Sequence, residues 1–279
     1  MDRDALHGFL ELTRPVNGFV AGVLTFIGAF VASGALANPR LTIAAVIATW
    51  LATAAGNAIN DYFDRDIDDI NAPDRPIPRG AVSPRDSLFF SLILFAGAVA
   101  VALTLPILAI AIAGINLVAL VAYTELFKGL PGAGNAVVAY LGGSTFLFGA
   151  AAVGSPRAGA VLFVLAALST FSREVIKDIE DIEGDREEGL RTLPIVIGER
   201  RALAVALVVL LFAVVASPLP YLWDIFGAVY LIVVAPADLL MLGASLMAVE
   251  DPSAGQRYLK YGMFLAALAF VVGRFATLG

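Results

Sequence analysis

Residues 41–68 read LTIAAVIATWLATAAGNAINDYFDRDID, a run of apolar and small residues that ends in a series of acidic ones. The apolar part is about 20 residues long, the length that an α-helix needs to cross the hydrocarbon core of a bilayer. The polar part begins at Asn57 and Asn60 and continues through Asp61, Asp64 and Asp68. This stretch therefore predicts a membrane-spanning helix that carries carboxylates at its end.

Apolar runs of this kind recur along the whole chain of 279 residues. Hydrophobic residues make up 59% of the sequence and charged residues 15%, whereas soluble domains average about 25% charged residues. The mean hydropathy is +0.87. We predict nine spans, at residues 15–36, 41–60, 87–105, 107–127, 134–154, 157–177, 201–217, 221–248 and 256–276. The expected fold is all-α, a polytopic membrane protein with a single domain over residues 1–279.

The charged residues predict how the chain is oriented. Fifteen of the 18 Lys and Arg residues lie in the N-terminus and in the loops after the even-numbered spans, and the exceptions are Arg40, Arg157 and Arg274. Because basic loops stay in the cytoplasm, we expect a cytoplasmic N-terminus and an external C-terminus in the cell membrane. The net charge of −6 and the absence of cysteine exclude a nucleic-acid binder and thiolate chemistry.

A second acidic segment, after the sixth span, repeats the spacing of the first. Asp178, Asp181 and Asp185 follow the pattern D-x-x-D-x-x-x-D, each 117 residues after its counterpart in the first segment. If both segments continue their helices, 100° per residue places three carboxylates on one face of each. Such like charges repel, so we expect cations to offset them. A solvated acidic loop is the alternative, and the repeated spacing disfavours it.

The oxygen ligands of the two segments suit a hard divalent cation, because the chain has no cysteine and one histidine. Mg²⁺ commonly combines one or two carboxylates with substrate phosphates, so the pair of segments predicts two Mg²⁺ ions around one diphosphate. The candidate metal ligands are Asn60, Asp61, Asp64, Asp68, Asp178, Asp181 and Asp185, with Asn57 nearby. Basic groups would stabilise the charge on a departing diphosphate. The candidates for this role are Arg75, Arg79, Lys128, Arg173 and Lys177.

Taken in order, these motifs resemble the UbiA family of intramembrane prenyltransferases. The resemblance is carried by Arg14-Pro15-x-Asn17, Asn60-Asp61-x-x-Asp64-x-x-x-Asp68, Arg75-Pro76, Tyr123 with Lys128, Lys177-Asp178-x-x-Asp181-x-x-Gly184-Asp185 and Thr192-Leu193-Pro194. It implies nine transmembrane helices around a central cavity, with cytoplasmic cap loops at about residues 61–86 and 178–200. It also implies Mg²⁺-dependent transfer of a polyprenyl group from its diphosphate to an acceptor.

The resemblance assigns roles to individual residues. Asn60, Asp64 and Asp68 would serve one metal, Asp181 and Asp185 the other, with Asp61 and Asp178 in support. The catalytic residues would be Asp64, Asp68, Asp181, Asp185, Lys128 and Tyr123. In many relatives the tyrosine and the lysine are four residues apart. Here they are five apart, which in an α-helix turns Tyr123 about 140° away from Lys128.

The partners that the resemblance implies are a polyprenyl diphosphate, a lipid acceptor and the surrounding membrane lipid, and no protein partner can be inferred. The second motif is most similar to that of archaeal members that join a geranylgeranyl group to geranylgeranylglyceryl phosphate. An aromatic acceptor of the quinone or chlorophyll pathways is the alternative. Candidates for contact with the acceptor or cavity are Arg14, Asn17, Asn57 and Asp238. Asp238 lies inside the eighth span, where acids are functional candidates.

A secondary transporter is the hypothesis from a different class, because such proteins also combine internal repeats with polar residues in their helices. Transporter sites lie near the midplane of the bilayer, whereas both acidic segments here lie at the ends of predicted spans. The sequence therefore favours an enzyme.

Overall fold

The computed structural model describes residues 3–32, 35–127 and 129–278, and these contain helices and no strand. The all-α prediction is thus confirmed. Eight helical stretches of the described chain are long and apolar enough to cross a membrane. They are α1–α2 (Arg3–Thr13 and Pro15–Val31), α3 (Pro39–Phe63), α5 (Pro84–Ala102), α7 (Ala133–Ala152), α8 (Pro156–Glu180), α11–α12 (Glu199–Ala216 and Leu219–Leu222), α13 (Ala228–Met247) and α14 (Pro252–Phe275).

The predicted span at residues 107–127 differs from the others. It forms a shorter α-helix, α6 (Ile107–Ala122), which continues directly into a π-helix, η1 (Tyr123–Phe127). A π-helix is rare, occurs mostly as a single turn within an α-helix, and is frequent at functional sites. The change of helix type therefore marks residues 123–127 for closer attention.

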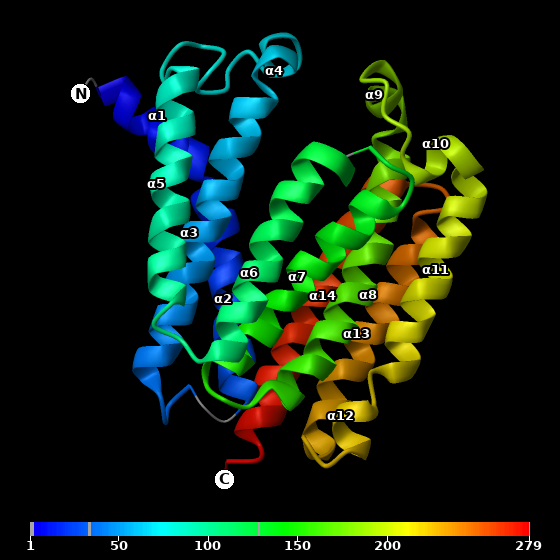
Figure 1. Ribbon diagram of the computed structural model, residues 1–279. Coiled ribbons are helices and arrows are strands. Elements are labelled where there is room, and N and C mark those ends of the chain that lie inside the picture. Colours follow the sequence, from blue (N-terminus) through cyan, green and yellow to red (C-terminus); the bar gives the residue numbers. More distant parts are fainter. Residues whose placement is uncertain (1–2, 33–34, 128, 279) are drawn as a thin grey trace.

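The long helices run side by side between the two ends of a bundle (Figure 1). The short helices α4 (Arg65–Asn71), α9 (Ile182–Glu187) and α10 (Leu193–Ile197) lie at the same end as α1. The C-terminus and α12 lie at the opposite end. Termini at opposite ends require an odd number of crossings, which is reached when the shorter helix at Ile107–Ala122 is counted beside the eight longer stretches of the described chain.

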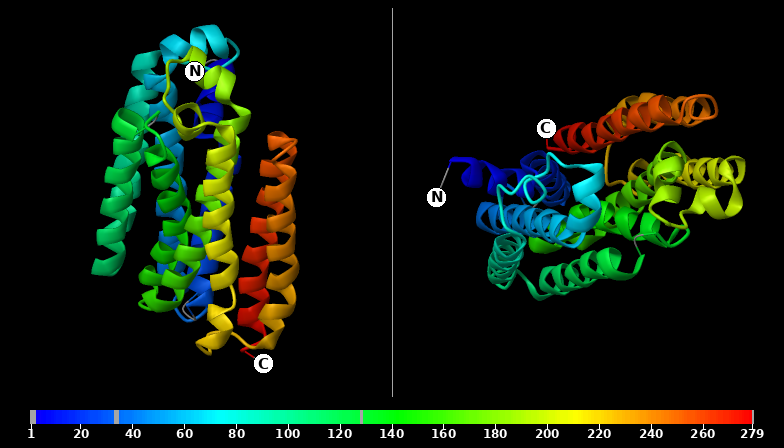
Figure 2. Two further views of the ribbon diagram at one scale, coloured as in Figure 1. Left: turned by 90° about the vertical axis from the view of Figure 1, so that its right-hand side faces the viewer. Right: turned by 90° about the horizontal axis from the view of Figure 1, so that it is seen from above.

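Seen from the end that holds α4 and α9, α13 and α14 run along one side of the bundle and α6 along the other (Figure 2). A core of buried side chains from α2, α7, α8, α13 and α14 joins these elements, and it includes Phe146, Leu162, Tyr230 and Phe270. This packing fixes the position of α8, the helix that carries the second acidic motif.

Glycines allow α2 and α7 to approach closely within this core. A Cβ atom at Gly28 would lie 2.1 Å from the backbone oxygen of Phe146, and one at Gly149 would lie 1.9 Å from that of Thr25. Contacts of this kind leave no room for any side chain. Close backbone approach through small residues is how membrane helices compensate for the weak hydrophobic drive between them.

Candidate active site

The two acidic motifs fold in the same way. The first begins in α3, passes Asp64 at the junction, and ends in α4; the second begins in α8, passes Asp181 at the junction, and ends in α9. The N–H of Asp64 donates to Asn60 O at 2.8 Å and that of Asp181 donates to Lys177 O at 3.0 Å. The sequence repeat therefore corresponds to a repeat in backbone structure.

The expectation of an uninterrupted helix through each motif is wrong, because both helices break at the central aspartate. Repulsion between neighbouring carboxylates and their opposition to the helix dipole are the physical reasons that favour a break there. Among the described residues, no three Asp, Glu or His side chains lie close enough together to hold a metal ion. The three carboxylates of each motif therefore do not converge on a single metal-binding point.

The carboxylates of the first motif are paired with two arginines. Arg14 Nη2 lies 2.6 Å from Asp61 Oδ1, while Arg75 Nη1 lies 2.5 Å from Asp68 Oδ2 and 3.7 Å from Asp61 Oδ1. Asp61 and Asp68 are both buried. Burial acts to lower the pKa of Arg75, but its hydrogen bond to Asp68 and the neighbouring negative charges outweigh this and raise the pKa. Arg75 therefore stays charged while it holds Asp61 and Asp68.

Arg14 reaches the first motif because of a sharp corner between α1 and α2. Its backbone is left-handed, with φ 45°, and Pro15 begins α2 immediately afterwards. The sequence identified Arg14 only as a candidate for contact with acceptor or cavity. The structure places its guanidinium on Asp61 instead.

The carboxylates of the second motif have fewer basic partners than those of the first. Asn135, near the start of α7, donates from Nδ2 to Asp178 Oδ2 at 2.8 Å. Lys177 Nζ is 3.8 Å from Asp181 Oδ2, and both side chains are about half exposed. Asp185 Oδ2 is buried and has no hydrogen-bond partner among the described residues. Burial raises the pKa of the Asp185 carboxyl, although the nearby Thr192 hydroxyl acts to lower it. A bound cation would stabilise the ionised carboxylate further.

Tyr123 lies between the two motifs. It is close enough to Asp64, Asp178, Asp185 and Glu174 for their charges to act on its hydroxyl group. The 140° separation that the sequence predicts between Tyr123 and Lys128 assumed an α-helix, and the π-helix at Tyr123–Phe127 invalidates that assumption. Lys128 itself lies outside the described residues.

The other predicted site residues have separate environments. Arg79 Nη1 contacts Glu11 at 2.7 Å, on α1, and Asn57 Nδ2 donates to the backbone oxygen of Thr13 at 3.0 Å. Arg173 contacts Glu174 at 2.5 Å and Gln256 at 3.1 Å. Asn17 is exposed at the start of α2. The structure therefore brings Arg14 and Arg75 to the acidic motifs and holds Arg79 against α1.

Two residues of the site were not identified from the sequence. Asn135 is a polar residue at the start of an apolar span, and Glu174 lies one helical turn before Asp178 on the same face of α8. These positions were the available signals. Asn135 pairs with Asp178 on another helix, and Glu174 forms an ion pair with its neighbour Arg173. A search for motifs in the sequence reveals neither contact.

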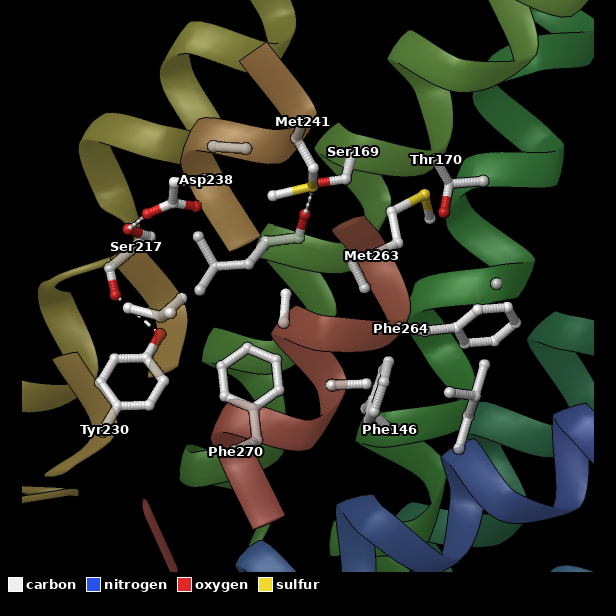
Figure 3. Close-up of a pocket in the computed structure, with 18 residues that line it drawn as sticks. Phe146, Ser169, Thr170, Ser217, Tyr230, Asp238, Met241, Met263, Phe264 and Phe270 are labelled. Atoms are coloured by element: carbon white, nitrogen blue, oxygen red, sulfur yellow. Dashed lines mark hydrogen bonds between the residues drawn. The ribbon is translucent and has the colours of Figure 1, made fainter. Parts of the chain in front are cut away.

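An apolar cavity of about 110 Å³ lies among α2, α7, α8, α11, α13 and α14 (Figure 3). Large apolar side chains form most of its wall, among them Phe146, Met241, Met263, Phe264 and Phe270. Asp238 is part of a polar network at one side: Ser217 Oγ donates to Asp238 Oδ2 at 2.5 Å, and Tyr230 donates its hydroxyl to Ser217 O at 2.8 Å. Asp238 is therefore a buried member of the cavity wall with a neutral partner.

The cavity lies below the second acidic motif along α8. Ser169 and Thr170 line it, and at 1.5 Å per residue they are about 12–14 Å from Asp178 along the helix axis. The bundle thus combines two acidic helix ends with an apolar chamber that begins about two helical turns beneath the second of them. Such an arrangement suits an amphiphile that carries a strongly anionic head.

Comparison with known proteins gives a consistent result over the whole chain. The model of the UbiA prenyltransferase family matches residues 21–268. Digeranylgeranylglyceryl phosphate synthase of Halobacterium salinarum is 64% identical over 97% of this chain and 98% of its own. The Natronomonas pharaonis enzyme of the same name is 63% identical over 98% and 99%. That of Methanopyrus kandleri is 44% identical over 95% and 98%.

Solved structures support the same fold. A structure described as giving insight into digeranylgeranylglyceryl phosphate synthase in membranes superposes with a TM-score of 0.87 at 36% identity, covering 97% of this chain and 98% of that one. A UbiA homologue from Archaeoglobus fulgidus, bound to GPP and Mg²⁺, superposes with a TM-score of 0.74 at 18% identity, covering 98% and 100%. The latter likeness concerns the fold alone.

Proposed function

The chain belongs to the UbiA prenyltransferase family, and from this premise we propose that it transfers a geranylgeranyl group from geranylgeranyl diphosphate to geranylgeranylglyceryl phosphate. The product would be the digeranylgeranylglyceryl phosphate from which archaeal ether lipids are built. Near-complete coverage at 64% identity to an enzyme of that name supports this acceptor. The single structural observation that carries the proposal is the pair of equivalent broken helix ends at Asp64 and Asp181, above an apolar cavity.

The donor atoms of the two motifs fit Mg²⁺. They are carboxylate and amide oxygens, the ligands that this ion prefers, and Asp185 Oδ2 is a buried oxygen without a partner among the described residues. We assign one ion to Asn60, Asp64 and Asp68 and a second to Asp181 and Asp185, with Asp61 and Asp178 in support. When bound, Mg²⁺ withdraws charge from the diphosphate and makes it a better leaving group.

The residues of the chain hold the reactants on either side of the bond that breaks. Arg75, Arg173 and Lys177, with Lys128 by resemblance, are assigned to the diphosphate, where their charges match the charge that develops on the leaving group. Arg14 stays on Asp61 and neutralises the carboxylate that is most buried in the first motif. Asn135 fixes the orientation of Asp178. Tyr123 lies between the motifs, where the reacting carbon would be.

The reaction breaks the bond between C1 of the geranylgeranyl group and the diphosphate oxygen. It forms an ether bond between the same carbon and the free glycerol hydroxyl, whose proton leaves with the diphosphate. The allylic cation that develops at C1 must be kept from water. Phe146, Phe264 and Phe270 line an apolar chamber for the prenyl chain, and an environment without water protects such a cation.

The protein crosses the membrane several times, as its apolar helices and its family require. We propose that the end with α4, α9 and α10 faces the cytoplasm, since the basic loops gather there. In this arrangement residues 1–279 form one domain, and residues 61–86 and 178–200 form a cap over the site. Both substrates enter as lipids from the membrane.

The acceptor is tested with purified protein in lipid nanodiscs. Geranylgeranyl diphosphate and Mg²⁺ are supplied together with geranylgeranylglyceryl phosphate, an aromatic acid or a quinol precursor, and products are identified by mass spectrometry. We expect an ether-linked product with the glyceryl phosphate only. Prenylation of the aromatic compound in place of the glyceryl phosphate would contradict the proposed acceptor but not the proposed donor.

A further inference from the structure

A second hollow lies at the opposite end of the bundle from the acidic motifs. This outer groove, of about 1010 Å³, lies among α2, α8, α11, α12 and α14, and its wall includes Val31, Val161, Val164, Trp223 and Ile225. Apart from Ser155, Arg157 and Arg274, the residues that line it are apolar. It is therefore a surface along which a hydrocarbon chain can lie.

Leu165 lies between the outer groove and the apolar cavity. Among the described residues it alone lines both, and its side chain is only 7% exposed. On α11 the boundary falls between Ala216, which lines the groove, and Ser217, which lines the cavity. On α8 the boundary is the Leu165 side chain itself, which a substitution can remove without changing the backbone.

The depth of Leu165 matches the length of a four-unit prenyl chain. Leu165 precedes Asp178 by 13 residues on α8, a distance of about 20 Å along the helix axis. An extended isoprene unit, with four carbon–carbon bonds of about 1.5 Å at tetrahedral angles, is about 5 Å long, so four units also measure about 20 Å. A geranylgeranyl chain with its diphosphate at the acidic motifs would thus end at Leu165.

The volume of the cavity agrees with this estimate. A dry cavity of about 150 Å³ holds benzene, with its six carbons. The cavity of about 110 Å³ therefore holds the last five-carbon unit of the chain. A two-unit chain would end about 10 Å below the motifs and would not reach Ser169 or Thr170, where the cavity begins.

We propose that Leu165 sets the upper limit on the length of the prenyl donor by closing the apolar cavity against the outer groove. The inference rests on the proposed function, because it takes the cavity as the place of the donor chain. Removal of the Leu165 side chain joins the cavity to the groove and lets a fifth or sixth unit continue along Val161 and Val164. A larger side chain at the same position shortens the cavity.

The test compares donors of 15, 20, 25 and 30 carbons in direct competition, with products resolved by mass spectrometry. For Leu165→Ala we expect the ratio of 25-carbon to 20-carbon transfer to rise at least tenfold over the wild-type ratio. For Leu165→Phe we expect a shift toward the 15-carbon donor. The matched control is Leu162→Ala, because Leu162 belongs to the same core and is fully buried but lines neither hollow.

The wild-type ratio in both Leu165 variants would overturn the proposal, as would an equal change in Leu162→Ala. If Leu165→Ala fails to fold, Leu165→Val supplies the same comparison with a smaller loss of volume. Thermal stabilisation by each prenyl diphosphate without acceptor gives a second readout of donor length. Wild-type protein that binds these donors but transfers them to no acceptor would contradict the proposed function, and the stabilisation series would still decide the role of Leu165.

Discussion

Arg75 Nη1 lies 2.5 Å from Asp68 Oδ2 and thereby places a positive charge where the first motif would hold its metal ion. The same guanidinium is 3.7 Å from Asp61. A diphosphate offers Arg75 a stronger anionic partner, so the arginine and the metal need not compete once the donor is bound. This suggests that the first motif takes up its ion together with the donor.

Arg75→Gln should therefore have opposite effects on two properties. We expect tighter Mg²⁺ binding without donor, because the competing cation is gone, and a transfer rate lower by about 100-fold, the usual cost of losing one group that stabilises developing negative charge. Calorimetry of Mg²⁺ binding and steady-state kinetics measure the two effects. Weaker Mg²⁺ binding in this variant would show that Arg75 supports the ion.

Asp185→Asn tests the buried oxygen without a partner. The pKa of Asp185 is raised above its ordinary value of 3.8 by burial, so the folded protein holds this proton more tightly than the unfolded protein does. Without metal, the contribution of this one carboxyl to stability is fully present below pH 3.8 and is lost as the pH rises through the raised pKa. We expect the variant to lose this dependence, to melt at a higher temperature in EDTA at neutral pH, and to lose stabilisation by Mg²⁺.

The control for Asp185→Asn is the wild-type protein scanned by thermal unfolding over the same pH range, with and without Mg²⁺. A variant that melts below the wild type in EDTA would indicate that the carboxylate is already stabilised by some other group. In that case the Asp185 carboxylate would not need a bound cation to stabilise its charge.

Asn135→Ala removes the hydrogen bond that orients Asp178. We expect kcat to fall about tenfold with little change in the KM of the acceptor, and the Mg²⁺ dependence to shift to higher concentration, because a misplaced ligand weakens metal binding by 10- to 100-fold. Ser144→Ala is a matched control on α7, since Ser144 donates only to Leu141 O of its own helix. An Mg²⁺ dependence unchanged from the wild type would exclude a positioning role for Asn135.

Arg14 and Arg79 form a pair for comparison, since both follow from the sequence as site candidates but have different partners in the fold. Arg14 contacts Asp61 of the first motif and Arg79 contacts Glu11 of α1. We expect Arg14→Gln to lower kcat/KM by at least tenfold and Arg79→Gln to lower it less than threefold, with the main effect on melting temperature. A larger loss of kcat/KM in Arg79→Gln than in Arg14→Gln would instead indicate that Arg79 contacts the diphosphate.

The sequence was sufficient for the spans and for the acidic repeat, because apolar length and residue spacing are local properties. It was insufficient where the backbone departs from a regular α-helix. The breaks at Asp64 and Asp181 and the π-helix at Tyr123–Phe127 change the direction of side chains, and none of them has a signature that spacing alone reveals. The angle of 100° per residue therefore does not apply from Tyr123 onward.

Partners that come from distant segments were also beyond the sequence. Arg14 reaches Asp61 across 47 residues through a left-handed corner, and Asn135 reaches Asp178 across 43. Both contacts depend on how whole helices pack. The basic residue types needed near a diphosphate were predictable, but which arginine contacts which carboxylate was not.

In the proposed function the two acidic motifs act together on one diphosphate. The most direct measurement is release of diphosphate from geranylgeranyl diphosphate in a single turnover with geranylgeranylglyceryl phosphate and Mg²⁺, for the wild type, Asp64→Ala and Asp181→Ala. We expect stoichiometric, Mg²⁺-dependent release by the wild type, with one ether product formed for each diphosphate, and no release by either variant. Full Mg²⁺-dependent release by one of the two folded variants would contradict this joint action.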